Sequence, residues 1–301
     1  MKPSVEIVRP ARVEDAAAIA RLGREVDPHL LTTEEMFRRL LTEKSRPTTE
    51  RLVAEVDGTV VAWTPSGLYE SGIGWLGILV LPAHRGRGIG GRIYERVESR
   101  LRGLGATRLE TAASDEDGRR FLLARGFAVT NVMRRSELDP GTLEPVEAPP
   151  GVDVVPLRDL ADRAEDLYRL YAETRADIPS REPRTPWTFE EWRSQTLELP
   201  LLDHDASVVV LEGGEPVSFA WLLSDREGGR AETLMAGTRR DRRGQGLVTL
   251  AKIESSRRAA ALGIRRIVTS NDRENEPMLA INRRLGFRES GVEESFAKQL
   301  G

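Results

Sequence analysis

Two short glycine-rich turns are the segments of this chain best suited to bind an anion. The first begins at Arg85 and reads Arg-Gly-Arg-Gly-Ile-Gly, and the second begins at Arg243 and reads Arg-Gly-Gln-Gly-Leu-Val. Each turn lies between an apolar run and an amphipathic pattern that predicts a helix. A helix start leaves N–H groups unpaired and carries partial positive charge, and glycine lets the backbone approach a ligand closely. Each turn therefore predicts a diphosphate site.

The two turns belong to a longer sequence repeat. Arg243 follows Arg85 by 158 positions, and Gly286 follows Gly126 by 160. Such near-constant spacing indicates a duplicated domain, and the repetition disfavours the alternative of a tight connection that binds nothing. A proline- and glycine-rich linker separates the copies. The expected domains are an N-terminal domain over 1–140, a linker over 141–151 and a C-terminal domain over 152–301. The predicted diphosphate-binding residues are Arg85, Gly86, Arg87, Gly88, Ile89 and Gly90 in the first copy, and Arg243, Gly244, Gln245, Gly246, Leu247 and Val248 in the second.

Both copies predict a hairpin, then a central strand, the turn with its helix, and a further strand. These predicted strands are 52–55, 60–63, 73–81 and 108–112 in the first copy, and 208–211, 217–223, 232–238 and 264–270 in the second. The segment from Asp177 to Asp205 is absent from the first copy and is rich in proline and aromatic residues. It predicts either a lid over a substrate or packing between the two halves.

The composition argues against several kinds of site and partner. The chain has no cysteine, and its three histidines are far apart, so we expect no metal site. A net charge of −3 with mixed signs predicts no nucleic-acid partner. No segment is long and apolar enough to span a membrane, and the N-terminus lacks a secretory apolar run. We therefore expect a cytoplasmic protein with no membrane partner, as a monomer or a homodimer.

The residues around both turns carry a family resemblance. The segment from Val80 to Gly90 resembles the acetyl-CoA motif of the GNAT superfamily of N-acetyltransferases, and Arg125-Gly126-Phe127 resembles the signature that follows it. The second copy is similar in 243–247 and 271–287. The resemblance covers almost the whole chain, with a plan similar to tandem GNAT proteins. It implies acetyl-CoA as co-substrate and an α/β (α+β) fold of two GNAT-like domains, each a mixed, mostly antiparallel central sheet with flanking helices.

The resemblance also implies roles for residues beside the turns. In the family, the strand before the turn hydrogen-bonds the pantetheine arm of the cofactor. The corresponding residues are Leu79 and Val80 in the first copy, and Gly237 and Thr238 in the second. Asn275 matches a family asparagine that contacts this arm, and it is equally suited to cap the helix that follows. Val248 replaces the final Gly or Ala of the motif, which implies a more crowded turn.

Two residues of the second copy are candidates for catalysis. The family commonly places a carboxylate general base on the strand before the turn, where this copy has Glu232 and the first copy has no acid. Asp225 and Asp177 are the alternatives. The family's usual tyrosine acid is replaced by Asn282, which can hydrogen-bond a sulfur atom but is a poor acid, and by Leu122 in the first copy. We expect both copies to bind acetyl-CoA and the second to catalyse.

Three functions follow from this resemblance. The one we favour is transfer of an acetyl group to the primary amine of a small molecule, which makes a small-molecule amine acceptor the expected partner. The second is a protein or peptide N-acetyltransferase. The third is a non-catalytic acyl-CoA-binding protein, which the missing tyrosines favour. The fold alone does not choose among acceptors, because the acceptor pocket varies within a fold.

Overall fold

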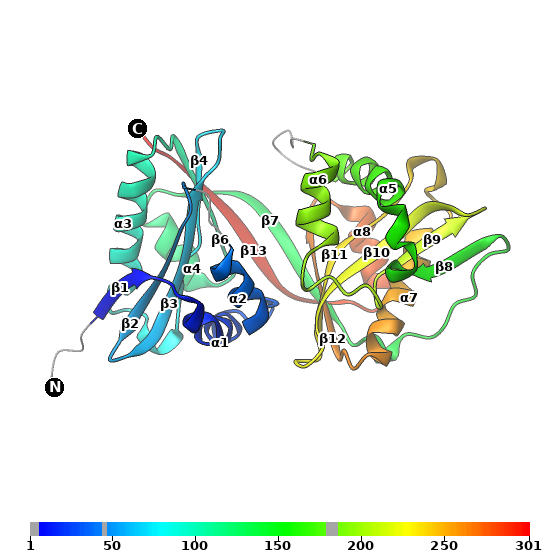
Figure 1. Ribbon diagram of the computed structural model, residues 1–301, viewed down its shortest axis with the longest axis horizontal. Coiled ribbons are helices and arrows are strands. Elements are labelled where there is room, and N and C mark those ends of the chain that lie inside the picture. The colour runs from blue at the N-terminus through cyan, green and yellow to red at the C-terminus, as the bar shows by residue number, and fades with distance from the viewer. Residues whose placement is uncertain (1–5, 44–46, 179–185) are drawn as a thin grey trace. The chain divides into compact units, whose positions relative to one another are not determined.

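The computed structural model describes residues 6–43, 47–178 and 186–301, and the chain divides into two compact units (Figure 1). Unit 1 consists of Met1–Met133 with Val292–Gly301, and unit 2 consists of Arg134–Gly291. Each unit contains a mixed sheet with helices packed on both faces. The predicted α/β fold with two repeated halves is therefore confirmed.

The sheet of unit 1 has the strand order β1-β2-β3-β4-β6-β13, and β5 pairs with β3. Its strands are β1 Glu6–Pro10, β2 Glu50–Val56, β3 Thr59–Leu68, β4 Ile73–Leu76, β5 Leu79–Val80, β6 Arg108–Ala113 and β13 Arg288–Gln299. Its helices are α1 Ala16–Val26, α2 Glu34–Thr42, α3 Ile89–Gly103 and α4 Glu116–Leu123. Strands β4 and β6 run parallel, and the other pairs of this unit run antiparallel.

The sheet of unit 2 has the strand order β7-β12-β11-β10-β9-β8. Its strands are β7 Ala128–Leu138, β8 Val152–Pro156, β9 Val208–Glu212, β10 Glu215–Asp225, β11 Arg230–Thr238 and β12 Arg266–Asp272. Its helices are α5 Ala164–Ala176, α6 Phe189–Trp192, α7 Leu247–Ala261 and α8 Glu276–Arg284. Strands β11 and β12 run parallel, as β4 and β6 do in unit 1.

Alternation along the strands assigns side chains to the two faces of each sheet. In β2, Leu52 and Ala54 pack in the cluster that includes α3, whereas Val53 between them packs in the cluster that includes α1 and α2. In unit 2, α7 and α8 contribute to one set of clusters, and α5 and α6 pack with aromatic residues on the other face, where Trp192 and Trp221 are fully buried. Each sheet thus has a face toward the turn helix and an opposite face.

The last strand of each sequence copy completes the sheet of the other unit. Strand β13 pairs antiparallel with β6 of unit 1, and its Phe296, 1% exposed, lies in the core of that unit. The end of β7 places Leu138, 4% exposed, in a core cluster of unit 2. The expected boundaries, 1–140 and 152–301, follow the repeated sequence and stay a prediction. The compact units divide at other residues because of this strand exchange.

Lys298 of β13 and Leu138 of β7 occupy equivalent places in the two units. A Cβ atom added to Gly126 would lie 4.0 Å from the Lys298 side chain, and one added to Gly286 would lie 3.8 Å from that of Leu138. Gly126 and Gly286 are matching positions of the repeat, each just before a core phenylalanine. The two exchanged strands therefore bring different side chains, one charged and one apolar, to the same site of the fold.

The helices that face these two places also differ. In unit 1, the Lys298 ammonium donates hydrogen bonds to the Tyr94 hydroxyl and the Glu98 carboxylate, each at 2.9 Å. At the position of Tyr94, α7 carries Lys252, which is 3% exposed, with its Nζ 5.0 Å from the centre of the Phe287 ring. Burial lowers the pKa of Lys252 to about 8. One unit thus has its lysine on the exchanged strand, and the other has it on the helix.

Replacing Phe296 by alanine is expected to lower the free energy of unfolding by about 3–5 kcal/mol, because the ring fills the core of unit 1. Amide hydrogen exchange should become faster in β6, which lies far from residue 296 in sequence but pairs with its strand. Val292→Ala on the same strand is the control, since Val292 is 44% exposed and its truncation should cost little. Faster exchange confined to β12 in Phe296→Ala would contradict the strand exchange.

Lys252→Met is expected to change how stability depends on pH. Between pH 8 and 10.5 the unfolded chain holds a proton on Lys252 that the folded chain releases, so this group makes stability rise with pH across that window. The methionine variant should lack this rise and be more stable than the parent at pH 7, by up to about 3 kcal/mol. Urea unfolding at pH 7, 9 and 10.5 measures the effect, and an unchanged pH dependence would contradict it.

Candidate functional site

The two glycine-rich turns have nearly the same backbone conformation. Gly86 and Gly88 have φ angles of +73° and +80°, and Gly244 and Gly246 have φ angles of +77° and +79°. These values lie in the left-handed region, where a residue with a Cβ is strained. The second glycine of each turn is the N-cap of the helix that follows, α3 or α7. The sequence therefore folds the backbone of both turns in the same way, and in the first turn the Arg92 guanidinium lies against Gly88.

Backbone amides at each helix start point into these turns without a helical acceptor. The first hydrogen bond of α3 runs from the Arg92 N–H to the Gly88 carbonyl at 3.1 Å, and that of α7 runs from Leu250 to Gly246 at 3.0 Å. The N–H groups before them have no acceptor within the helix. These amides belong to Ile89, Gly90 and Gly91 in the first copy, and to Leu247, Val248 and Thr249 in the second. Both turns thus have the donors that a diphosphate requires.

The arginine that opens each turn braces it. Arg85 Nε donates to the Val80 carbonyl, and Arg243 Nε donates to the Thr238 carbonyl, both at 3.2 Å. The Arg85 guanidinium also forms an ion pair with Asp115 at 2.9 Å. These contacts hold the turn against the strand that precedes it, so the two arginines shape the turn whether or not they also contact a ligand.

Asp177, one of the proposed general bases, is the acidic partner of the second turn. It accepts hydrogen bonds from Arg240 and from Arg243. These two guanidinium groups hold the pKa of the Asp177 carboxyl far below its usual range. Such a carboxylate is a weak base, and its contacts assign it to bracing the turn. Asp225, the other alternative, pairs with Arg230 at 2.8 Å at the end of the β10–β11 hairpin.

In both units the parallel pair of strands separates just before the turn. In unit 2 the β11–β12 pairing ends at Glu232 and Val268, whereas β11 continues to pair with β10 as far as Thr238. In unit 1 the β4–β6 pairing ends at Trp75, and among the described strands β5 pairs with β3 alone. One edge of the strand before each turn is therefore left without a neighbouring strand, and an extended ligand can hydrogen-bond there. The predicted arm-binding residues on this edge are Leu79 and Val80, and Gly237 and Thr238.

Gly237 and Thr238 are closely packed against their own unit. A Cβ atom added to Gly237 would lie 2.9 Å from the Thr174 Cβ of α5, so a larger residue would displace that helix. The Thr238 hydroxyl lies 2.8 Å from the Ser218 hydroxyl and is buried. Packing therefore determines which residues fit at positions 237 and 238, and the backbone of β11 is the part that a ligand can contact.

Glu232 lies at the last pair of the parallel ladder, on the face covered by α5 and α6. Its antiparallel partner on β10 is Leu223, which packs against the aromatic cluster of that face, and directly opposed residues share a face. The cluster includes Tyr171, which stacks at 7° to Trp221, and the buried Trp192 of α6. A carboxylate at the point where the strands separate can take a proton from a group bound on this face.

The equivalent place in unit 1 is occupied by tryptophan. Trp75 is the last residue of the β4–β6 pairing, as Glu232 is of the β11–β12 pairing. Its indole lies against Gly67, since a Cβ atom added there would be only 2.8 Å from the ring. The sequence repeat, with its offset of 158, would match Glu232 to Gly74, which is one residue before Trp75. The repeat alone therefore does not identify Trp75 as the equivalent of Glu232. Only the strand register identifies it.

The two asparagines singled out in the second copy have different surroundings. Asn275 is the N-cap of α8, and its side chain accepts a hydrogen bond from the Met278 N–H at 3.4 Å, so it does cap the helix. Asn282 is 1% exposed, and its Nδ2 donates to Asn271 Oδ1 of β12 at 2.7 Å. Its own Oδ1 is buried and has no hydrogen-bond partner among the described residues.

The segment from Asp177 to Asp205 packs at least in part on its own unit. Trp187, Phe189 and Trp192 belong to the aromatic cluster with α5 and β10, and Trp192 is fully buried. Residues 179–185 of this segment, with Pro179 and Pro183, lie outside the described residues. The aromatic part is thus core of unit 2, on the face that carries Glu232.

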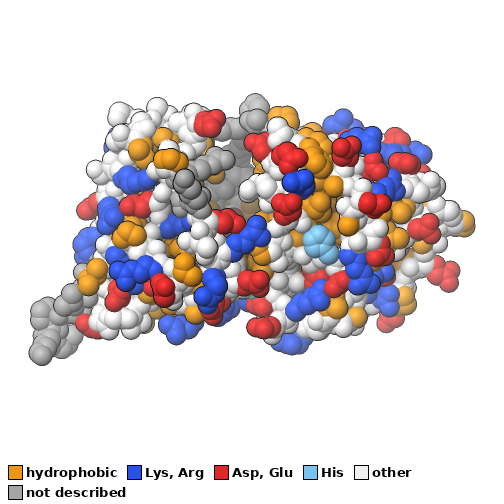
Figure 2. Space-filling view, in the orientation of Figure 1, with side chains coloured by type: hydrophobic (Ala, Val, Ile, Leu, Met, Phe, Trp, Pro, Cys, Tyr) orange, Lys and Arg blue, Asp and Glu red, His pale blue; other side chains and the backbone are white. Residues whose placement is uncertain are grey.

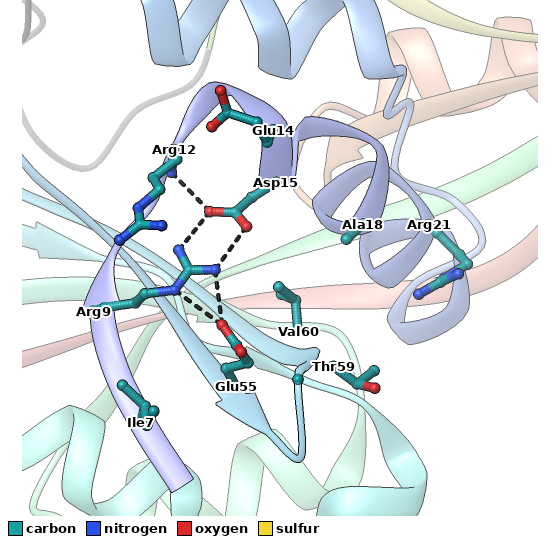
Figure 3. Close-up of a pocket in the computed structure, with 11 residues that line it drawn as sticks. Ile7, Arg9, Arg12, Glu14, Asp15, Ala18, Arg21, Glu55, Thr59 and Val60 are labelled. Atoms are coloured by element: carbon teal, nitrogen blue, oxygen red, sulfur yellow. Dashed lines mark hydrogen bonds and ion pairs between the residues drawn. The ribbon is translucent and has the colours of Figure 1, made fainter.

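A polar pocket of about 610 Å³ in unit 1 lies apart from both turns (Figure 3). Arg9 crosses it and pairs with Asp15 and Glu55, and the Arg9 guanidinium lowers the pKa of Asp15. Its lining comes from β1, the start of α1 and the β2–β3 hairpin, and includes no residue of a turn. We therefore assign it no part in the candidate site.

Neither a metal site nor a membrane span is found in the described part of the chain. Residues 6–43, 47–178 and 186–301 contain no group of three or more His, Cys, Asp or Glu placed to hold a metal ion. No described helix is long and apolar enough to cross a membrane. On the face shown in Figure 2, acidic and basic side chains are interspersed.

Comparisons with known proteins agree with this geometry. The family model described as "Acetyltransferase (GNAT) family" matches residues 17–127 and 164–287. Mycothiol acetyltransferase of Clavibacter michiganensis subsp. michiganensis (strain NCPPB 382) is 27% identical over 314 residues, 98% of this chain and 97% of the relative. Among solved structures, a tandem GNAT protein from the clavulanic acid biosynthesis pathway matches with a TM-score of 0.76 at 18% identity, over 99% of both chains. A GCN5-related N-acetyltransferase from Sphaerobacter thermophilus matches with a TM-score of 0.74 at 19% identity, over 98% of this chain and 95% of that one.

Gly86→Asp and Gly244→Asp are expected to weaken acetyl-CoA binding at the first and the second turn by tenfold or more. No atom of the described residues lies within 4 Å of a Cβ atom at either glycine, so the new carboxylate fits and repels the diphosphate. The controls are Gly86→Asn and Gly244→Asn, which have the same shape and also tolerate a positive φ but carry no charge. Calorimetric titration of the full chain measures both sites. Equal effects of Asp and Asn would contradict an anion site.

Proposed function

Because the chain belongs to the acetyltransferase (GNAT) family, we propose that it transfers the acetyl group of acetyl-CoA to the primary amine of a small molecule, and that the second copy is the catalytic one. The observation that carries this proposal is the position of Glu232. It lies where β11 and β12 separate, on the face opposite the turn helix, and Trp75 takes the equivalent place in the first copy.

In this proposal the gap between β11 and β12 joins the two substrates. The diphosphate binds the amides at the start of α7, and the pantetheine arm extends along the free edge of β11 past Gly237 and Thr238. The thioester then reaches the end of the parallel ladder at Glu232. The acceptor amine arrives from the opposite face, covered by α5 and α6. Holding both groups at one point supplies much of the rate enhancement.

Two proton transfers accompany acetyl transfer in this proposal. Glu232, directly or through a water, takes a proton from the amine, whose nitrogen forms a C–N bond with the acetyl carbonyl carbon. A backbone N–H on the separated part of β11 stabilises the oxyanion that develops. The C–S bond then breaks, and the thiolate of coenzyme A leaves. Asn282 is a poor acid, so in this proposal the thiolate takes its proton from water.

The first copy, in this proposal, binds acetyl-CoA without transferring the acetyl group. Its turn has the same backbone conformation and the same open amides as the second. On the strand before its turn, however, Trp75 takes the place of Glu232, and its indole lies over Gly67 on the face where an acceptor would bind. The carboxylate opposite Trp75, Glu110 of β6, forms an ion pair with Arg108 at 3.0 Å. A bound cofactor there would contribute to the stability of unit 1 instead of to turnover.

A small acceptor is favoured by what covers the acceptor face. Helices α5 and α6 and an aromatic cluster lie over the face that carries Glu232. A face covered by helices admits a small molecule more easily than a protein surface. The name of the Clavibacter relative, mycothiol acetyltransferase, supports acetyl transfer by a chain of this length and plan. It does not identify the acceptor of this chain.

Glu232→Gln is expected to lower kcat by about 10²–10⁴-fold and to change the KM for acetyl-CoA little, because the amide keeps the shape but cannot accept the proton. The matched control is Glu227→Gln, which makes the same change at an exposed position of the β10–β11 turn and should leave kcat unchanged. The assay is thiol release from acetyl-CoA with a panel of small amines.

Other outcomes of the same assay would redirect the proposal. Activity with peptides and with none of the small amines would favour a protein acetyltransferase. Activity lost in Gly86→Asp but retained in Gly244→Asp would assign catalysis to the first copy. Binding of acetyl-CoA without thiol release on any acceptor would favour a non-catalytic binding protein.

A further inference from the structure

Asn271 and Asn282 form a buried amide pair that leaves one hydrogen-bonding atom unused. Asn282 Nδ2 donates to Asn271 Oδ1 at 2.7 Å, while Asn282 Oδ1 is buried and has no partner among the described residues. Asn282 is 1% exposed. A buried carbonyl oxygen without a donor destabilises the fold, typically by about 1–3 kcal/mol. A bound ligand that donates a hydrogen bond would satisfy this oxygen.

The first copy shows that the fold itself does not need this pair. The equivalent residues are Ala113 at the end of β6 and Leu122 on α4, and Leu122 is a buried core residue. The backbone is the same in both copies, since the Phe127 N–H donates to the Leu122 carbonyl as the Phe287 N–H donates to that of Asn282. An apolar pair therefore fills this place in one copy, and the polar pair of the other serves a different purpose.

The pair lies beside the path proposed for the cofactor arm. Asn271 is three residues beyond Val268, the last residue of β12 that pairs with β11, so it belongs to the separated part of the strand. Asn282 faces it from α8. The two amides thus border the gap on the face toward the turn helix, the side from which the cofactor enters, whereas Glu232 lies on the opposite face.

The chemistry of the free atom selects its partner. A carbonyl oxygen accepts hydrogen bonds and donates none. The diphosphate, the thioester and the departing thiolate of coenzyme A have no proton to donate. The pantetheine arm carries one hydroxyl, next to its diphosphate end, and two amide N–H groups between that hydroxyl and the thioester. We propose that Asn282 Oδ1 accepts a hydrogen bond from an amide N–H of this arm, and that Asn271 orients Asn282 for it. This rests on the proposed binding of acetyl-CoA by the second copy.

The test compares ligands with and without the arm. The Gly86→Asp background removes binding at the first turn, so that titration measures the second turn alone. In this background, a variant that combines Asn271→Ala with Asn282→Leu carries the residue pair of the first copy. Its affinity for coenzyme A and for desulfo-coenzyme A should fall about tenfold. Its affinity for 3′-phospho-ADP, which has the diphosphate and no arm, should stay within twofold of the parent. Calorimetry measures the three ligands, and thermal unfolding checks the fold.

A second measurement leaves the protein unchanged. Coenzyme A analogues in which one arm amide is replaced by an ester lack the N–H in question. One of the two should bind the second copy about tenfold more weakly, and this loss should vanish in the double variant, as a thermodynamic cycle requires. If the double variant does not fold, the same contact is tested by comparing the two copies of the unchanged protein. One ester analogue should then bind more weakly than coenzyme A at the second copy and equally well at the first.

Several results would overturn the proposal. Unchanged affinity for coenzyme A would make the pair structural, and an equal loss for 3′-phospho-ADP would place its effect at the turn. Loss with coenzyme A but not with desulfo-coenzyme A would show that the amide faces the sulfur. These readouts are independent of turnover: if Glu232→Gln retained full activity, the proposed function would fail while the arm contact could still stand.

Discussion

The site depends on one interruption of hydrogen bonding, the separation of two parallel strands before each turn. Continuous pairing of β11 with β12 would satisfy both edges and close the sheet to any ligand. Because the pairing stops at Glu232 and Val268, one edge of β11 stays open while β10 holds the other edge. The glycines of the turn then place helix amides just beyond that edge. The end of the parallel ladder and the glycine turn together thus leave an open edge of β11 and unpaired helix amides next to each other.

The two copies show how one backbone supports different uses. The turns, their bracing arginines and the strand separation are the same in both. Two of the differences lie at the gap: Glu232 against Trp75 on one face, and Asn282 against Leu122 on the other. The second copy has polar groups at both places, and the first has apolar or aromatic ones. The chain therefore contains its own reference for separating what the fold requires from what a reaction requires.

The sequence predicted the local features well, because glycines, apolar runs and helix patterns act over a few residues. The family, the mixed α/β fold and the acetyltransferase activity are confirmed, whereas the individual site residues and domain boundaries remain predictions.

The sequence does not identify Trp75, because the offset of 158 that relates the two turns is wrong by one residue at the parallel strands. The predicted strand 73–81 is two strands that pair with β3 in one register, interrupted where Pro65 accepts a hydrogen bond from the Gly77 N–H but has no N–H to return one. The exchange of last strands depends on partners far apart in sequence.

Because the last strands are exchanged, each half of the chain depends on side chains supplied by the other half. If each half kept its own last strand, Lys298 would enter unit 2 beside the buried Lys252, where two like charges would meet without a carboxylate such as Glu98. Leu138 would in turn leave Tyr94 and Glu98 without their ammonium partner. The halves are thus no longer interchangeable modules: neither can be excised, or replaced by a foreign copy, without also supplying the matching strand of its sibling.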